Sequence, residues 1–172
     1  MNHFLLAQIS GAIAVAFSLL LYQFNSRRTM LILDMCGNLF WIITFLQLRA
    51  PTGLSMVVIG ALTCLIFIKI KPTKENIWIL VLILTAIVIA TLWTWSGAIG
   101  LLAMGGSVLY TVRFWTTSTT VIRRVSLLAA PLWFAYDVII GNYPGAFIEV
   151  VGTGSNLLGQ YRFDIKSDKT TT

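Results

Sequence analysis

Charged residues are scarce in this chain. Asp, Glu, Lys and Arg together make up 10% of its 172 residues, whereas they make up about 25% of a typical soluble domain. Hydrophobic residue types account for 58%. A chain with so few charges lacks the polar side chains that a water-facing surface needs. We therefore expect an integral membrane protein whose main partner is the lipid bilayer.

Histidine and cysteine are also rare. The only histidine, His3, lies near the N-terminus, and the two cysteines, Cys36 and Cys64, lie inside apolar runs. Such residues do not form the spaced pattern of a metal site, and an isolated buried cysteine usually packs as a small apolar residue. No nucleophile and base occur in a pattern typical of an active site. We predict no metal, no cofactor and no enzymatic activity.

Long apolar segments dominate the rest of the chain. A helix needs roughly 20 apolar residues to cross a bilayer, with a range of about 17–25. A helix over residues 77–115 would exceed that length, so we expect a turn near Gly97. Short polar or Pro/Gly breaks leave seven predicted spans: residues 4–22, 30–48, 53–69, 77–95, 97–115, 124–140 and 145–161.

The positive charges are distributed unequally between the two sides of these spans. Eleven of the twelve Lys and Arg residues fall on one side, and Arg49 alone falls on the other. Loops rich in Lys and Arg remain in the cytoplasm. The N-terminus is therefore predicted outside and the C-terminus inside. The net charge of +6 is explained by this orientation, so we expect no nucleic-acid partner.

Two three-helix units can be aligned within the chain. At an offset of 93 residues, Pro51 corresponds to Pro144 and Lys69 corresponds to Arg162. A single extra helix between two such units gives both the same orientation in the membrane, so the units would be parallel repeats. The predicted fold class is an all-α membrane protein in which seven transmembrane helices form two three-helix repeats joined by a linker helix. The first repeat covers residues 1–71, the linker 72–96, the second repeat 97–163 and a disordered cytoplasmic tail 164–172.

This plan resembles that of the SWEET sugar transporters and the wider PQ-loop superfamily. The segment "LWFAYDVIIGNYPGAFIEVVGTGSNLLGQYRF" (residues 132–163) is similar to the second and third helices of their repeat. Over most of its length the chain resembles the YgjV-type family of bacterial inner-membrane proteins. It departs from the superfamily in lacking the Pro-Gln pair, because Gln8 has no preceding proline. The resemblance implies an inner-membrane location and a transporter-like architecture, and it implies no substrate.

Three acidic residues lie within predicted spans, where each charge costs about 2.5–3.5 kcal/mol on insertion scales. Asp137 and Glu149 flank the turn between the last two helices, and Arg49 lies on the equivalent turn of the first repeat. One hypothesis is an outer gate in which Arg49 pairs with Asp137 or Glu149 across the repeats. The alternative is that both acids reach interfacial water independently.

Asp34 and Arg113 lie at the same level near the cytoplasmic ends of their predicted helices. One interpretation is an inner gate formed by this pair. The other, which the sequence favours, is a local pair of Asp34 with Arg27, Arg28 or a loop donor.

Polar and aromatic residues at mid-depth are the candidates for solute binding. Transporters that resemble this chain use a Trp and an Asn in each repeat, since an aromatic face packs against a ring and an amide both donates and accepts. Alternatively, the tryptophans are interfacial anchors and the asparagines bond neighbouring helices. Glu149 is an alternative to Asn156 as the polar residue that faces the centre. The candidates are Asn38, Trp41, Thr63, Trp133, Tyr136 and Asn156.

Two functions remain after these exclusions. The first is a carrier or facilitator of a small polar solute. The second is a structural or partner-binding membrane protein that does not transport. A hydrated central cavity lined by both repeats would favour the first, and a centre filled with Leu and Phe would favour the second.

Overall fold

The structure is a computed structural model that describes residues 2–165. Over that range it is helical and contains no strand, and each predicted span coincides with one of seven α-helices, so the all-α prediction with seven helices is confirmed. Residues 166–172, most of the predicted tail, lie outside the described residues. The helices are α1 (His3–Leu21), α2 (Arg27–Gln47), α3 (Pro51–Lys69), α4 (Ile77–Trp93), α5 (Ile99–Phe114), α6 (Thr119–Ile140) and α7 (Tyr143–Gln160), followed by the short π-helical segment η1 (Tyr161–Ile165).

Helix ends depend on local residues that bond the free backbone groups. The side chain of Ser118 accepts the backbone N–H of Val121 and caps α6. Because of this cap, α6 begins at Thr119, five residues before the predicted start at 124. Arg123 therefore lies inside the helix and not in a loop.

Arg123 also changes the boundary of the tail. Its guanidinium forms an ion pair with Asp164 at 2.7 Å, and its side chain is fully buried. Asp164 was assigned to the tail from residue 164 onward, but this ion pair holds it in η1 against the bundle. The buried cation needs a partner, and Asp164 supplies one.

The turns at the end of the bundle that carries the N-terminus use left-handed backbone conformations. Gly97 has a φ of 83°, Gly141 a φ of 74° and Arg49 a φ of 54°. Glycine adopts such angles without steric cost. The chain reverses near Gly97, so the predicted turn between the fourth and fifth helices is confirmed.

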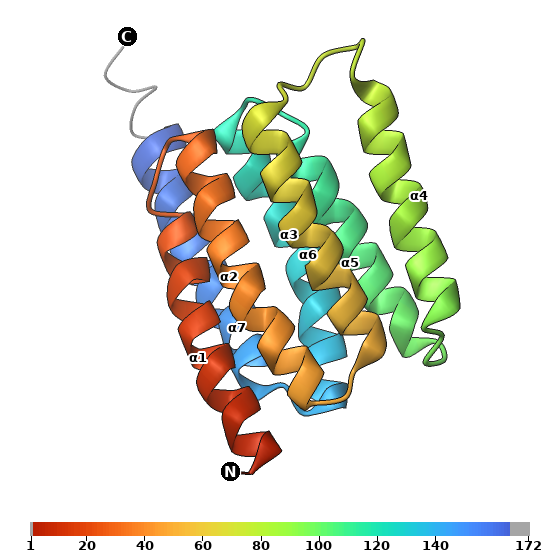
Figure 1. Ribbon diagram of the computed structural model, residues 1–172. Helices are drawn as coiled ribbons and strands as arrows, with labels where there is room; N and C mark the ends of the chain where they lie inside the picture. The colour runs from red at the N-terminus through yellow and green to blue at the C-terminus, as the bar shows by residue number, and fades with distance from the viewer. Residues whose placement is uncertain (1, 166–172) are drawn as a thin grey trace, which may run out of the picture.

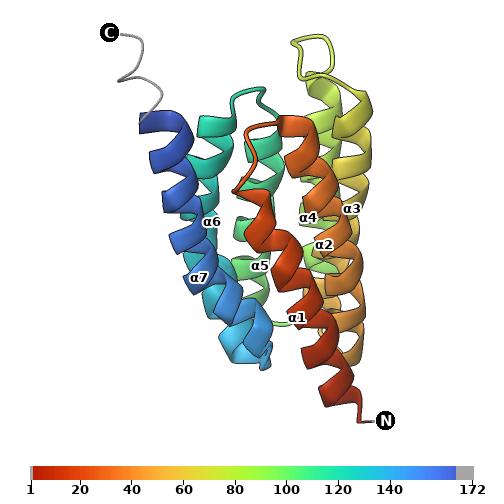
Figure 2. The same cartoon turned by 90° about the vertical axis from the view of Figure 1, so that its left-hand side faces the viewer.

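Six helices form a closed ring. Going round it, α1 packs against α2, α2 against α3, α3 against α5, α5 against α6, α6 against α7 and α7 against α1. The remaining helix, α4, lies outside the ring against α3 and α5, and Figure 1 shows it to one side of the bundle. Figures 1 and 2 place the N-terminus and the end of α7 at opposite ends of the bundle, as an odd number of spans requires.

Apolar side chains cover the outside of the bundle, and many polar ones lie inside. Trp78, Leu92 and Trp93 on α4 are exposed, whereas Arg113 and Asn156 are buried. This distribution suits a bilayer, in which polar groups need partners within the protein. By length and hydropathy, α1, α2 and α3 qualify as membrane spans. The apolar helices α4 and α5 are shorter, and α6 and α7 contain the charges of Arg123, Asp137 and Glu149.

Candidate functional site

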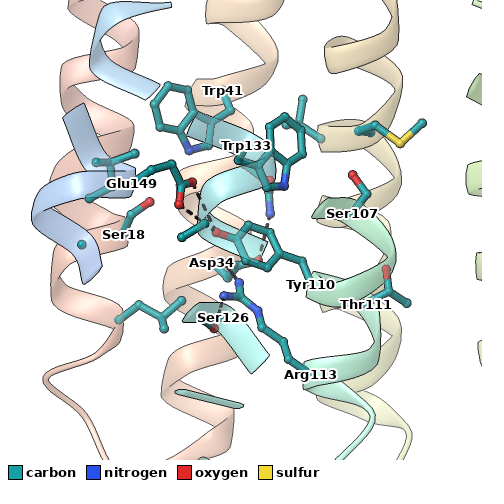
Figure 3. Close-up of a pocket in the computed structure, with 18 of the residues that line it drawn as sticks. Ser18, Asp34, Trp41, Ser107, Tyr110, Thr111, Arg113, Ser126, Trp133 and Glu149 are labelled. Atoms are coloured by element: carbon teal, nitrogen blue, oxygen red, sulfur yellow. Dashed lines mark hydrogen bonds and ion pairs between the residues drawn. The ribbon is translucent and has the colours of Figure 1, made fainter. Parts of the chain in front are cut away.

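A cavity of about 100 Å³ lies at the centre of the ring, and all six ring helices contribute to its wall. One water molecule needs about 10–15 Å³ by a comparable measure, so the cavity holds several waters or a small solute. Figure 3 shows polar and aromatic side chains that point into it. The lining contains three carboxyl groups and one guanidinium. These belong to Asp34, Asp137, Glu149 and Arg113.

The guanidinium of Arg113 is the centre of a bonded network. Its Nη2 lies 2.5 Å from Oδ1 of Asp34, and its Nη1 donates to the hydroxyl of Ser126 at 2.8 Å. The guanidinium carbon lies 3.9 Å from the ring centroid of Tyr110, which is a cation–π geometry. The Arg113 side chain is 2% exposed. A cation so deeply buried requires these partners.

Asp34 completes its hydrogen bonds with two further donors. The amide of Asn38 donates to its Oδ2 at 3.1 Å, and the thiol of Cys64 donates to the same oxygen at 3.3 Å. Asn38 lies one helical turn from Asp34, so the spacing of four residues brings the two side chains together. The carboxylate of Asp34 is thus matched by one cation and two neutral donors.

Glu149 differs from Asp34 in its partners. Both of its carboxylate oxygens accept from the hydroxyl of Tyr110, at 3.3 and 3.4 Å. Within residues 2–165 it belongs to no ion pair. Figure 3 shows this carboxylate extending from α7 toward the hydroxyl of Tyr110. Glu149 therefore brings to the cavity wall a carboxyl group that forms no ion pair with any cation of the described residues.

Aromatic rings form the part of the wall beyond Tyr110 and Glu149. Tyr110 stacks on Trp133 with ring centroids 6.4 Å apart, and Phe45 lies between Trp133 and Trp41 at 6.1 and 6.2 Å. Trp133 is 6% exposed, and its Nε1 has no hydrogen-bond partner among the described residues. The cavity thus offers aromatic faces beside a carboxyl group, whereas the Trp133 Nε1 is buried against Gly106.

The six mid-depth candidates divide into two groups. Five of them line the cavity, namely Asn38, Trp41, Thr63, Trp133 and Asn156. Two of these five use their polar groups elsewhere: the Thr63 hydroxyl donates to Ile59 O at 2.7 Å, and the Asn156 amide donates to Arg123 O at 2.8 Å.

Tyr136 is absent from the cavity lining formed by residues 2–165. Its hydroxyl oxygen accepts the backbone N–H of Gly53 at 2.8 Å, in the first turn of α3. The first N–H groups of a helix have no partner within the helix, and Tyr136 satisfies one of them. This bond gives Tyr136 a packing role between α3 and α6.

The structure does not bring Arg49 to either Asp137 or Glu149. Arg49 is exposed at the turn after α2, and no ion pair in the described chain includes it. Asp137 is instead buried and accepts from the amide of Asn142 at 2.9 Å. The expected three-residue cluster fails because both acids point into the bundle, whereas Arg49 lies on its surface.

At the other end, Asp34 does not form the local pair that the sequence favoured. Arg27 donates to backbone carbonyl oxygens of Phe67, Phe114 and Thr116 at 2.8–3.0 Å. These bonds close the helix ends of α3 and α5. Asp34 and Arg113, the alternative pair, are the ones that the structure joins.

Sequence reasoning missed four residues of the Arg113–Asp34 network, and it also missed Asn142 beside Asp137. The four are Tyr22, Cys64, Tyr110 and Ser126. Tyr110 had a detectable signal, because it lies three residues before Arg113 and so on the same face of a helix. Ser126 and Asn142 had none, since a serine in an apolar helix and an asparagine in a turn have many other roles.

The comparisons with known proteins agree with a membrane location. Residues 5–167 match the Imp-YgjV family, which is described as a bacterial inner membrane protein family. Searches of the curated proteins and of the solved structures found no match. Because the match covers nearly the whole chain, the chain belongs to the Imp-YgjV family and is an integral membrane protein.

Proposed function

We propose that this member of the Imp-YgjV family is a carrier or facilitator that moves a small solute through the centre of its helix ring. The observation that carries the proposal is the cavity, which all six ring helices line with charged, hydroxyl, amide and aromatic side chains. A protein with a purely structural role has no need of buried charge there, since such charge is costly inside a membrane.

The proposal includes an architecture of two parallel repeats, α1–α3 and α5–α7, with α4 as the linker. Helix packing supports it: α3 contacts α5, and α7 contacts α1. These two contacts would be equivalent under a twofold axis along the membrane normal. Tyr22 and Tyr110, which are 88 residues apart in the sequence, both lie beside the Arg113 guanidinium.

We propose an orientation with the N-terminus outside and the C-terminus in the cytoplasm. Its support is the distribution of Lys and Arg: among those within residues 2–165, Arg49 alone belongs to the end of the bundle that carries the N-terminus. That the protein has no enzymatic activity stays a prediction.

A second candidate is a membrane protein that keeps this architecture without transport. The small cavity favours it, because ligand pockets for drug-sized molecules measure about 300–1,000 Å³. A small solute fits the observed volume.

A blocked-cavity variant separates the two candidates. Ser107 on α5 lines the cavity and is buried, whereas Val112 on the same helix is exposed. Proteoliposomes with the wild-type chain should take up a labelled solute from a panel of sugars, nucleosides, amino acids and amines. Ser107→Phe should abolish that uptake, and Val112→Phe should leave it unchanged. If neither the wild type nor the Val112→Phe control moves any solute above empty liposomes, the carrier proposal is wrong.

A further inference from the structure

Carboxyl groups outnumber guanidinium and ammonium groups in the cavity wall, although the chain as a whole is basic. Lys and Arg outnumber Asp and Glu by 12 to 6 in the sequence. In the cavity wall the ratio is reversed, since three carboxylates face one guanidinium. The interior of the ring is therefore an acidic site within a cationic protein, and such a site attracts cations.

Among the three carboxyl groups, only Asp34 has a cation within residues 2–165 as its partner, and Asp137 has an amide donor and a helix N-terminus. Asp34 is paired with Arg113 at 2.5 Å. Asp137 accepts from Asn142 at 2.9 Å and lies beside Gly145 in the first turn of α7, where the helix dipole favours a negative charge. Glu149 has only the neutral hydroxyl of Tyr110. A carboxylate held inside a membrane protein without a cation lacks the partner that such groups usually have.

The surroundings of Glu149 identify the kind of cation. A hard metal ion takes six or more oxygen ligands, but much of the wall near Glu149 is formed by the rings of Trp41, Trp133 and Tyr110, and Ser18 adds one hydroxyl there. Aromatic faces attract organic ammonium groups, and tryptophan does so best. Tyr110 already binds one cation in this way, since the Arg113 guanidinium lies over its ring.

We propose that the cavity binds a small organic ammonium ion, with its charge at the Glu149 carboxylate and its carbon atoms against Trp41 and Trp133. The inference rests on the proposed carrier function and names its substrate class. Small amines and quaternary ammonium ions are the simplest molecules that combine a positive charge with a compact apolar body.

The test uses pairs of probes with the same shape and different charge. Choline is compared with 3,3-dimethylbutan-1-ol, and 2-aminoethanol with propan-1-ol, as additives to the purified full chain in detergent at constant ionic strength. Binding is measured as a saturable rise in the midpoint of thermal unfolding. We expect at least one cation to bind about tenfold or more tightly than its neutral counterpart, because hydrogen bonds to charged groups are the stronger ones.

Variants test the role of Glu149. Glu149→Gln should weaken binding of the cation by about tenfold or more and leave the neutral probe unchanged. Glu75→Gln removes an exposed carboxylate from the loop before α4 and should change neither. Trp41→Leu should weaken binding of the cationic probe several-fold. If Glu149→Gln does not fold, the comparison of charged and neutral probes in the wild type still shows whether the cavity prefers an ammonium ion.

The outcomes distinguish this inference from the carrier proposal. Equal binding of charged and neutral probes, or a shift that sodium chloride reproduces, overturns the ammonium site. The ammonium site is also overturned if sugars or nucleosides enter proteoliposomes while both ammonium probes do not. In that case the carrier proposal remains supported. Both proposals are wrong if no solute of either class binds or enters.

Discussion

The guanidinium of Arg113 on α5 contacts the carboxylate of Asp34 on α2 at 2.5 Å, across the interior of the ring. The helix α3 lies between α2 and α5 in the ring, so the pair joins helices that are not neighbours. The pair also connects the first three helices to the last three. It lies at the end of the cavity opposite Trp41 and Trp133 (Figure 3).

Arg113→Met should destabilise the protein. Removing one partner of a buried ion pair costs about 3–5 kcal/mol, and the 21% exposure of the Asp34 side chain places the effect near the lower value. Arg124→Met, at an exposed position of α6, should change stability by less than about 0.5 kcal/mol. Denaturation in mixed micelles measures both. Equal effects of the two substitutions would contradict a structural role for the pair.

The double variant Asp34→Asn with Arg113→Met should be more stable than the sum of the two single losses predicts. Each single substitution leaves an unpaired charge in the bundle, whereas the double one leaves none. The coupling free energy should therefore exceed about 1 kcal/mol. A coupling near zero would show that Arg113 is stabilised by Ser126 and Tyr110 and not by Asp34.

Gly106→Ala should displace Trp133. A Cβ atom at Gly106 would lie 2.6 Å from Nε1 and Cδ1 of the Trp133 ring. Overpacking of this kind costs about 1–3 kcal/mol and would move the indole toward the cavity. Gly154→Ala is the matched control, since nothing lies within 4 Å of a Cβ there, and alanine in a helix is favoured by up to about 1 kcal/mol. Thermal unfolding and tryptophan fluorescence report the difference, and an unshifted spectrum for Gly106→Ala would contradict the close packing.

Asn142→Ala should lower the stability of the folded protein, whereas Arg49→Ala, at the same end of the bundle, should leave it unchanged. The Asn142 side chain donates to Asp137 at 2.9 Å and accepts the backbone N–H of Gly145 at 3.2 Å, so it supports a buried carboxylate and caps α7. Loss of a cap alone costs about 0.5–2 kcal/mol. Arg49 is exposed and takes part in no ion pair of the described chain. A double-mutant cycle of Arg49→Ala with Asp137→Asn should give a coupling near zero, and a large coupling would restore the outer gate.

Reporter fusions test the orientation. A fluorescent protein that matures only in the cytoplasm should be active when fused after Thr172, because eleven of twelve Lys and Arg residues belong to that side. A phosphatase that works only outside the cytoplasm should be active when inserted after Arg49. Reversed activities at both positions would mean that the positive charges do not set the topology of this protein.

The sequence by itself determined the helices and the kind of solvent around them. Seven apolar segments of suitable length predicted the seven helices. The number of Lys and Arg residues in the short loops predicted which loops face the cytoplasm. The break at Gly97 was predictable because bilayer thickness limits the length of a span. The start of α6 at Thr119 was harder to predict, because the hydroxyl of Ser118 caps the helix within a segment that reads as a polar loop.

Only the tertiary structure decided which polar groups meet. Asp34 had Arg27 and Arg28 close to it in sequence, yet it pairs with Arg113, 79 residues away. One hypothesis placed Glu149 with Arg49, but its carboxyl group accepts instead from the hydroxyl of Tyr110 on α5. Hydropathy and loop charge depend on each segment separately, so they can be obtained from a sequence. The partner of a buried charge depends on which helices lie next to each other and how each is rotated, and long-range packing alone fixes both.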